Sequence, residues 1–209
     1  MSTGKVGSVQ PCKRKRVMCP RCDYPEKQCV CRLIPLVEGD ITVWILQDKT
    51  EAKHAKNSAR LFRLCYAKTH IVSFSDNDAL TSFFRKVRGD NTVLLYPSDV
   101  SEPIETCDTD KIGSISNIVL LDGTWPKAKK MYLVEPRLQT LKTVNFQSPP
   151  RSHYEIRKSP NANALSTLEA AAYGLECLGN LRMSSVRHFF HEVIKMQWSQ
   201  QPDSHKHRI

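Results

Sequence analysis

The sequence contains no long hydrophobic run and has few acidic residues for its number of basic ones. No apolar segment approaches the ~20 residues that a membrane span needs, and the first residues do not resemble a secretory signal. We therefore expect a cytoplasmic protein without membrane attachment. The 31 Lys and Arg residues exceed the 21 Asp and Glu residues, which gives a formal net charge of +10. Five of these basic groups lie in residues 1–18, so an RNA partner is consistent with the charge but is not required by it.

The length of 209 residues is enough for one substantial core and a small appendage. We expect a disordered basic arm at residues 1–17, a small cysteine-bearing knuckle at 18–38 and the main α/β domain at 39–200. The charge run Lys13-Arg14-Lys15-Arg16 is either a solvated tail or an arm that grips phosphate groups. The sequence does not decide between a monomer and a homodimer.

Disulfide bonds are not expected, because the chain has the features of a cytosolic protein. Four of its eight cysteines lie close together, in the pattern Cys19-x-x-Cys22 and Cys29-x-Cys31. This spacing is typical of a tetrahedral, structural Zn²⁺ site, with redox-active or incidental cysteines as the alternatives. The remaining cysteines are expected to be free thiols.

Hydrophobic patterning predicts strands that alternate with helices over most of the chain. The predicted strands are residues 41–47, 70–74, 92–97, 117–121 and 141–146, and the predicted helices are 51–67, 78–88, 126–134, 166–178 and 184–199. Residues 98–116 are expected to form a loop or a short helix. Residues 147–164 show no periodicity but carry charged and aromatic groups, which favours a functional loop. This order predicts an α/β domain with a largely parallel sheet.

One predicted strand ends on an acidic residue. The apolar run of residues 117–121 is followed by Asp122 and Gly123, and Pro126 then fits the first turn of a helix that carries Lys127 and Lys130. The carboxyl end of a strand is the usual position of an active site in an α/β protein. The other interpretation is an aspartate that caps a turn beside a solvated lysine face. The physical pattern alone supports both.

The letters of this stretch resemble the signature of the DTW-domain family, the tRNA-uridine aminocarboxypropyltransferases. Further blocks that resemble the family follow its order and together cover about residues 19–180: Cys19-Pro20-Arg21-Cys22 with Cys29-Val30-Cys31, Leu95-Tyr96-Pro97, Asp122-Gly123-Thr124-Trp125, Tyr154-Glu155-Ile156-Arg157-Lys158 and Leu165-Ser166-Thr167-Leu168-Glu169-Ala170. The resemblance implies a SPOUT-like fold whose C-terminal half is knotted. True knots are so rare that the pattern of elements alone predicts none.

The resemblance also implies a reaction. S-adenosylmethionine would donate its 3-amino-3-carboxypropyl group to N3 of a tRNA uridine, with release of methylthioadenosine. Asp122 is the candidate base, and burial against Leu121 and Trp125 would raise the pKa of its carboxyl group. The residues expected to bind the donor are Leu95, Tyr96, Pro97, Gly123, Thr124, Trp125, Arg157, Lys158, Leu165, Ser166, Thr167 and Glu169. The residues expected to contact tRNA are Lys53, Asn57, Arg60, Lys127, Lys130 and Arg151.

Residues 166–169 also have a simpler explanation. Ser166-Thr167-Leu168-Glu169 matches a capping box, which is sufficient to explain all three polar residues, although the same helix N-terminus could meet the carboxylate of the donor.

The sequence departs from the family after the first strand. Members often carry His-Pro-x-Glu there, whereas this chain has Asp48-Lys49-Thr50-Glu51, and His54 is misplaced as a substitute for the histidine. Two other functions stay open: an S-adenosylmethionine-dependent RNA methyltransferase, because the implied fold is shared, and a non-catalytic zinc-knuckle RNA-binding protein. The target uridine and the tRNA species are not determined.

Overall fold

The computed structural model of the chain describes residues 17–54, 57–87, 89–106, 115–152, 165–179 and 181–199. The chain divides into two compact units, Met1–Arg32 and Leu33–Ile209. In the first unit, a bridge pairs Met18 with Pro25, and the 3₁₀ turn η1 (Glu26–Gln28) follows. Residues 1–16, most of the expected basic arm, lie outside the described residues.

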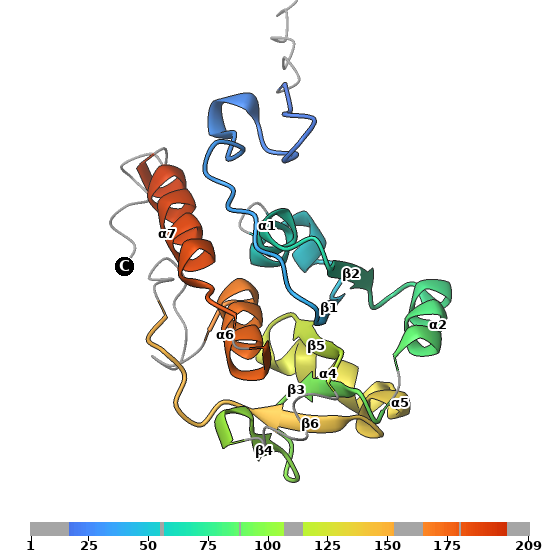
Figure 1. Ribbon diagram of the computed structural model, residues 1–209. Coiled ribbons are helices and arrows are strands. Elements are labelled where there is room, and N and C mark those ends of the chain that lie inside the picture. Colours follow the sequence, from blue (N-terminus) through green and yellow to red (C-terminus); the bar gives the residue numbers. More distant parts are fainter. Residues whose placement is uncertain are drawn as a thin grey trace, which may run out of the picture. The chain divides into compact units, whose positions relative to one another are not determined.

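The second unit contains a parallel sheet with the strand order β2-β1-β5-β3-β6-β4 (Figure 1). Its strands are β1 (Thr42–Gln47), β2 (Thr69–Ser73), β3 (Thr92–Leu95), β4 (Glu102–Pro103), β5 (Asn117–Asp122) and β6 (Lys142–Asn145). Every neighbouring pair is parallel, which confirms the predicted α/β class. The two-residue strand β4 lies where a loop or short helix was expected, because two residues are too few to show a period.

The helices are α1 (Ser58–Cys65), α2 (Asn77–Lys86), α4 (Trp125–Val134), α5 (Pro136–Gln139), α6 (Thr167–Gly179) and α7 (Ser184–Ser199), with 3₁₀ turns η2 (Glu51–Lys53) and η3 (Ile104–Thr106). The prediction of one helix over residues 51–67 is wrong. Helix α1 begins only at Ser58, because the side chain of Asn57 accepts a hydrogen bond from the amide of Arg60 and acts as its N-cap. Lys53 therefore belongs to η2 and not to the same helix face as Arg60.

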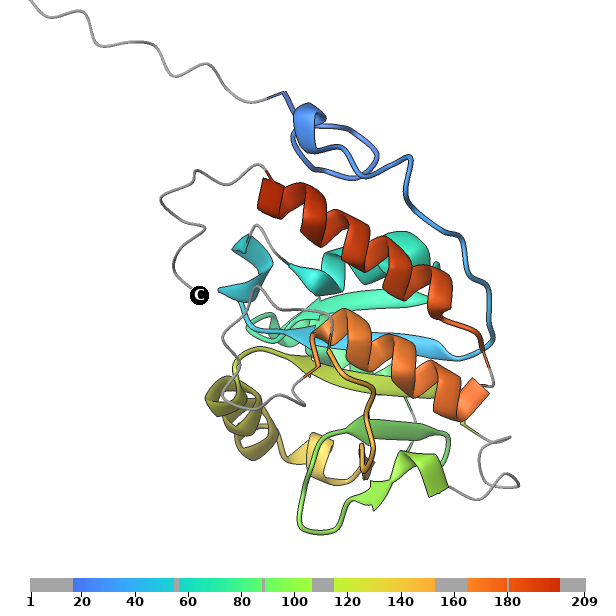
Figure 2. The same ribbon diagram turned by 90° about the vertical axis from the view of Figure 1, so that its left-hand side faces the viewer.

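Helices cover both faces of the sheet. In Figure 1, α6 and α7 lie on one side of the strands and α2 and α5 on the other, and Figure 2 shows α6 and α7 in front of the strands. Trp44 and Leu46 of β1 pack with Phe83 of α2 in one buried cluster. Because side chains alternate along a strand, Ile45 and Gln47 point to the opposite face. Asp122, which pairs with Gln47 in register, points to that face too.

Helix α6 packs closely against β5 because Gly174 has no side chain. A Cβ atom at this position would lie 2.6 Å from Cδ1 of Ile118. The glycine therefore allows the start of α6 to come within hydrogen-bonding reach of the end of β5. Among the described residues, no helix combines the length and apolar composition needed to cross a membrane.

Candidate active site

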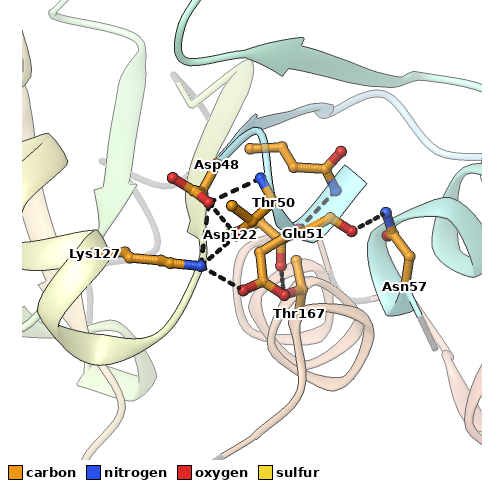
Figure 3. Close-up of polar contacts among 8 residues, drawn as sticks. Asp48, Thr50, Glu51, Asn57, Asp122, Lys127 and Thr167 are labelled. Atoms are coloured by element: carbon orange, nitrogen blue, oxygen red, sulfur yellow. Dashed lines mark hydrogen bonds and ion pairs between the residues drawn. The ribbon is translucent and has the colours of Figure 1, made fainter. Parts of the chain in front are cut away.

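Asp122 lies at the carboxyl end of β5 and is 8% exposed. Its two carboxylate oxygens have different donors (Figure 3). Nε2 of Gln47 donates to Oδ2 at 2.7 Å, and the hydroxyl of Thr167 donates to Oδ1. Gln47 is itself buried at the end of β1, and Thr167 is the first residue of α6. Two strands and a helix therefore position this carboxylate.

The capping box predicted at the start of α6 is present. The amide of Ser166 donates to Oε2 of Glu169 at 2.8 Å, and the amide of Glu169 donates to Oγ of Ser166 at 3.3 Å. The carboxylate of Glu169 also accepts a hydrogen bond from Ser152. Thr167 takes no part in this box. The prediction that capping explains all three residues is therefore wrong for Thr167, whose hydroxyl binds Asp122.

Lys127, which was expected to contact tRNA, is held by groups of the chain itself. Its Nζ atom lies 3.2 Å from Oδ1 of Asp48 and 3.2 Å from Oε1 of Glu51, and it donates to the hydroxyl of Thr50 (Figure 3). Hydrogen bonds to Asp48 and Glu51 raise the pKa of Lys127 above its usual value. The hydroxyl of Thr50 is the main cause of a lowered pKa at Asp48, to which Lys127 contributes. The ion pairs tie residues 48–51 to the start of α4.

Gly123 makes this arrangement possible. A Cβ atom there would lie 3.1 Å from Cβ of Lys127 and 3.7 Å from Cβ of Asp48. The backbone is also joined at this point, since the amide of Asp48 donates to the carbonyl of Asp122 at 2.9 Å. Asp48, the residue at the position of the family histidine, therefore lies beside the DTW turn.

Sequence reasoning missed Gln47, Asp48, Thr50 and Glu51 as members of this site. One signal was available for Gln47. It is a polar residue at the end of an otherwise apolar strand, and a buried amide is unfavourable unless it has a hydrogen-bonding partner.

Of the other residues expected to bind the donor substrate, only some are placed near the end of β5, which carries Asp122. Leu95 pairs with Leu120 in the β3–β5 register, so the end of β3 runs beside the end of β5. The ring of Tyr96 stacks on Tyr132 with a centroid separation of 4.4 Å, and burial raises the pKa of Tyr96. Trp125 is 55% exposed and not part of a buried wall. Arg157 and Lys158 lie outside the described residues.

The residues expected to contact RNA differ in their surroundings. Lys53, Lys130 and Arg151 are exposed. Asn57 is buried, and both ends of its amide are engaged: Oδ1 accepts from the amide of Arg60, and Nδ2 donates to the carbonyl of Glu51 at 3.1 Å. Asn57 therefore shapes the start of α1, whereas the basic side chains remain candidates for phosphate contacts.

The four clustered cysteines of the first unit have the geometry of a metal site. Their sulfur atoms all lie within 4.8 Å of one another, with separations of 3.6 Å for Cys19–Cys31, 3.8 Å for Cys22–Cys29 and 3.5 Å for Cys19–Cys29. A tetrahedral Zn²⁺ with Zn–S bonds of about 2.3 Å places its sulfur ligands about 3.8 Å apart. Hydrogen bonds from the amides of Cys22 and Arg21 lower the pKa of Cys19 to about 6, whereas burial raises the pKa of Cys31 to about 12, so that metal binding at this site would release the proton of Cys31. The cluster therefore fits a zinc ion.

A family model for the DTW domain matches residues 16–198. The chain belongs to the DTW-domain family. Its relatives include the tRNA-uridine aminocarboxypropyltransferase 2 of Drosophila melanogaster, which is 32% identical over 92% of this chain and 79% of the relative. The protein of the same name from Macaca fascicularis is 30% identical over 81% of this chain, and the tRNA-uridine aminocarboxypropyltransferase A of Arabidopsis thaliana is 24% identical over 81%. This DTW domain spans 59% of the macaque relative and 74% of the Arabidopsis one. No solved structure matches the chain.

Proposed function

We propose that this DTW-domain protein is a tRNA-uridine aminocarboxypropyltransferase. The observation that carries the proposal is the buried Asp122 of the DTW sequence, which Gln47 and Thr167 hold at the carboxyl edge of a parallel sheet. The names of the relatives describe this same activity. A buried carboxylate with two oriented oxygens is more than a turn cap, because capping requires neither a partner from another strand nor one from α6.

The donor in this proposal is S-adenosylmethionine, which supplies a methylene carbon bonded to a positively charged sulfur. Asp122 accepts the N3 proton of the uridine. The uridine nitrogen then forms a bond to the methylene carbon. The bond from that carbon to sulfur breaks, and its electron pair stays on sulfur. The products are 3-amino-3-carboxypropyl uridine and neutral methylthioadenosine.

Side chains around Asp122 supply orientation. Gln47 and Thr167 direct the carboxylate oxygens, and such positioning of a reacting group contributes up to about 7–11 kcal/mol to catalysis in the most favourable cases. The donor would lie between the end of β3, at Leu95-Tyr96-Pro97, and the turn at Gly123-Thr124-Trp125. Leu165 also belongs to the proposed donor site, as do Arg157 and Lys158, which lie outside the described residues.

The carboxylate of the donor has a better candidate partner than the start of α6. The amide of Ser166 already donates to Glu169, so the capping box uses the group that was expected to meet the ligand. At the start of α4, Thr124 is the N-cap residue and makes no side-chain cap hydrogen bond. We place the donor carboxylate near this second helix N-terminus, where the positive end of the helix dipole favours an anion.

The same proposal includes three further features, which concern the fold, a metal ion and the location of the protein. The fold would be SPOUT-like with a knotted C-terminal half. The parallel sheet supports the SPOUT-like part of this proposal. Cys19, Cys22, Cys29 and Cys31 would hold a structural Zn²⁺. The location would be cytoplasmic, as expected for an enzyme that modifies tRNA.

Product analysis tests the function directly. Purified protein is incubated with S-adenosylmethionine and unmodified tRNA, and the small-molecule product and the digested nucleosides are identified by mass spectrometry. We expect methylthioadenosine and a uridine that is heavier by one aminocarboxypropyl group. Formation of S-adenosylhomocysteine would instead indicate methyl transfer, and neither product would indicate an RNA-binding protein without this activity.

A further inference from the structure

A pocket of about 300 Å³ lies beside the proposed catalytic carboxylate, at the carboxyl ends of β1 and β2. Its volume is at the lower end of the range found for small-ligand sites. Gln47 ends β1 and Ser73 ends β2, and the two residues are paired in register. The side chains that give the pocket its chemistry are Gln47, Asn57, Arg60, Arg63, Ile71 and Ser73.

The lining is suited to an anion. Arg60 and Arg63 are three residues apart on α1, so their side chains lie on the same face of the helix. None of the lining residues is acidic. Arginine presents several N–H donors in a planar fork that matches a phosphate group, while the amide of Gln47 and the hydroxyl of Ser73 add uncharged polar groups.

The pocket is connected to Asp122 through one side chain. Gln47 lines the pocket and also donates to Oδ2 of Asp122 at 2.7 Å. A ligand in the pocket is therefore one side chain away from the proposed base. Asn57, another lining residue, donates to the carbonyl of Glu51 in the segment that leads into α1 (Figure 3).

The strand order separates this pocket from the proposed donor site. Strand β5, which carries Asp122, has β1 on one side and β3 on the other. The pocket lies on the β1–β2 side, whereas Leu95-Tyr96-Pro97, which begins with the last residue of β3, lies on the opposite side. Two reactants that approach Asp122 from opposite sides would meet at its carboxylate.

We propose that this pocket is the acceptor subsite and binds the phosphate group next to the target uridine, through Arg60 and Arg63. This inference rests on the proposed function and assigns one substrate to each side of Asp122. Binding of the phosphate fixes the position of the nucleotide, so that N3 of its base reaches Asp122 past Gln47. Ile71 supplies the apolar surface of the pocket. Asn57 shapes the wall, because its amide is already engaged with Glu51 and Arg60.

The test compares two arginine variants on different helices. Arg63→Gln removes a charge from the pocket, and Arg85→Gln removes an exposed charge from the last turn of α2 as the matched control. We expect Arg63→Gln to raise the KM for tRNA about tenfold, which corresponds to about 1.4 kcal/mol, because the variant loses a charge-assisted hydrogen bond to the phosphate. The slope of log KM against log salt concentration should decrease by about 0.7–0.9, the value for one lost phosphate contact. Arg85→Gln should stay within about twofold of the wild type.

Donor binding is measured in the same proteins by isothermal titration calorimetry with S-adenosylmethionine. The affinity should be unchanged in Arg63→Gln. A loss of donor affinity with an unchanged KM for tRNA would overturn the inference and assign the pocket to the carboxylate of the donor. Equal behaviour of Arg63→Gln and Arg85→Gln would overturn it as well.

A direct binding measurement separates this inference from the proposed function. Uridine 5′-monophosphate at millimolar concentration should shift the NMR signals of the Ile71 and Ser73 amides in the wild type, and much less in Arg63→Gln. Uridine without phosphate should shift them little. If the wild type makes no modified uridine but the nucleotide binds in this way, the proposed function fails and the anion pocket stands. If the enzyme is active but the nucleotide and the nucleoside give the same small shifts, the assignment of the pocket as a phosphate subsite is wrong and the proposed function stands.

Discussion

At the scale of single residues, the buried polar groups of the site form a connected set. Gln47, Asp122 and Thr167 come from two strands and a helix. Gln47 and Thr167 each donate a hydrogen bond to the carboxylate of Asp122. A buried polar group without a partner costs about 1–3 kcal/mol, so the set is stable only as a whole. Its members orient the carboxylate before any substrate binds.

The first prediction concerns Asp122→Asn. The amide oxygen of asparagine can still accept from Gln47, and its NH₂ group can donate to the hydroxyl of Thr167, so the fold and donor affinity should be nearly unchanged. The base is lost, which should reduce the single-turnover rate by about 10²–10⁴-fold. The exposed Asp78→Asn on α2 is the matched control. Near-normal turnover of Asp122→Asn would show that the carboxylate has only a structural role.

The second prediction concerns Lys127→Met, which keeps the aliphatic stem but removes the charge. The pKa of Lys127 is raised from 10.5, so its contribution to stability is present below that pH and is lost as pH rises through the folded value. The pKa of Asp48 is lowered from 3.8, so its contribution is present above that pH and is lost as pH falls through the folded value. The stability difference between wild type and variant should therefore be largest near neutral pH and shrink at both extremes.

Urea unfolding at a series of pH values measures this difference, with the exposed Lys129→Met as the control. A difference that stays constant from acid to alkaline pH would show that the ion pairs of Lys127 with Asp48 and Glu51 are not the source of the effect.

At the scale of elements, the two helix N-termini next to the site differ. Helix α6 starts with a reciprocal capping box, whereas the N-cap residue of α4, Thr124, makes no side-chain cap hydrogen bond. The positive end of the helix dipole attracts anions. The capped helix therefore serves to position Thr167, and the uncapped one is the better place for a ligand.

The third prediction tests this contrast through stability. Ser166→Ala removes the acceptor for the amide of Glu169 and should lower the free energy of unfolding by about 0.5–2 kcal/mol. Thr124→Ala removes no cap hydrogen bond and should change it by less. Denaturant unfolding of both variants measures the difference. Equal losses in the two variants would mean that the capping box contributes nothing specific.

The elements themselves were predictable where the pattern was long. The longer strands and α7 follow apolar runs or helical periodicity and appear within a few residues of the prediction. The failures were short or interrupted elements. Strand β4 and helix α5 contain two and four residues, and the predicted helix over 51–67 is divided because Asn57 begins a new helix.

At the scale of the whole molecule, the first unit is notable for its small core. Among its described residues, 17–32, the buried hydrophobic ones are Cys22, Tyr24 and Val30, which are far too few for an independent core. Small units of this kind usually depend on a metal or disulfides, and a structural Zn²⁺ contributes folding energy directly.

The fourth prediction follows from that dependence. Cys29→Ser should lower both the zinc content and the thermal stability of the purified protein, whereas Cys177→Ser, on α6, should leave the metal in place. Metal analysis by mass spectrometry and thermal denaturation provide the two readouts. Freshly purified wild-type protein without zinc would contradict the assignment.

The sequence by itself determined the α/β class, the acidic end of β5 and the clustered cysteines, because each depends on residues that are close together in the chain. Only the tertiary structure decided that Gln47 and Thr167, which lie 75 and 45 residues from Asp122, bind its carboxylate, and that Lys127 is held by Asp48 and Glu51. The physical reason is the strand order. Neighbouring positions in a parallel sheet depend on which strands pair and in what register, and local periodicity carries no information on either.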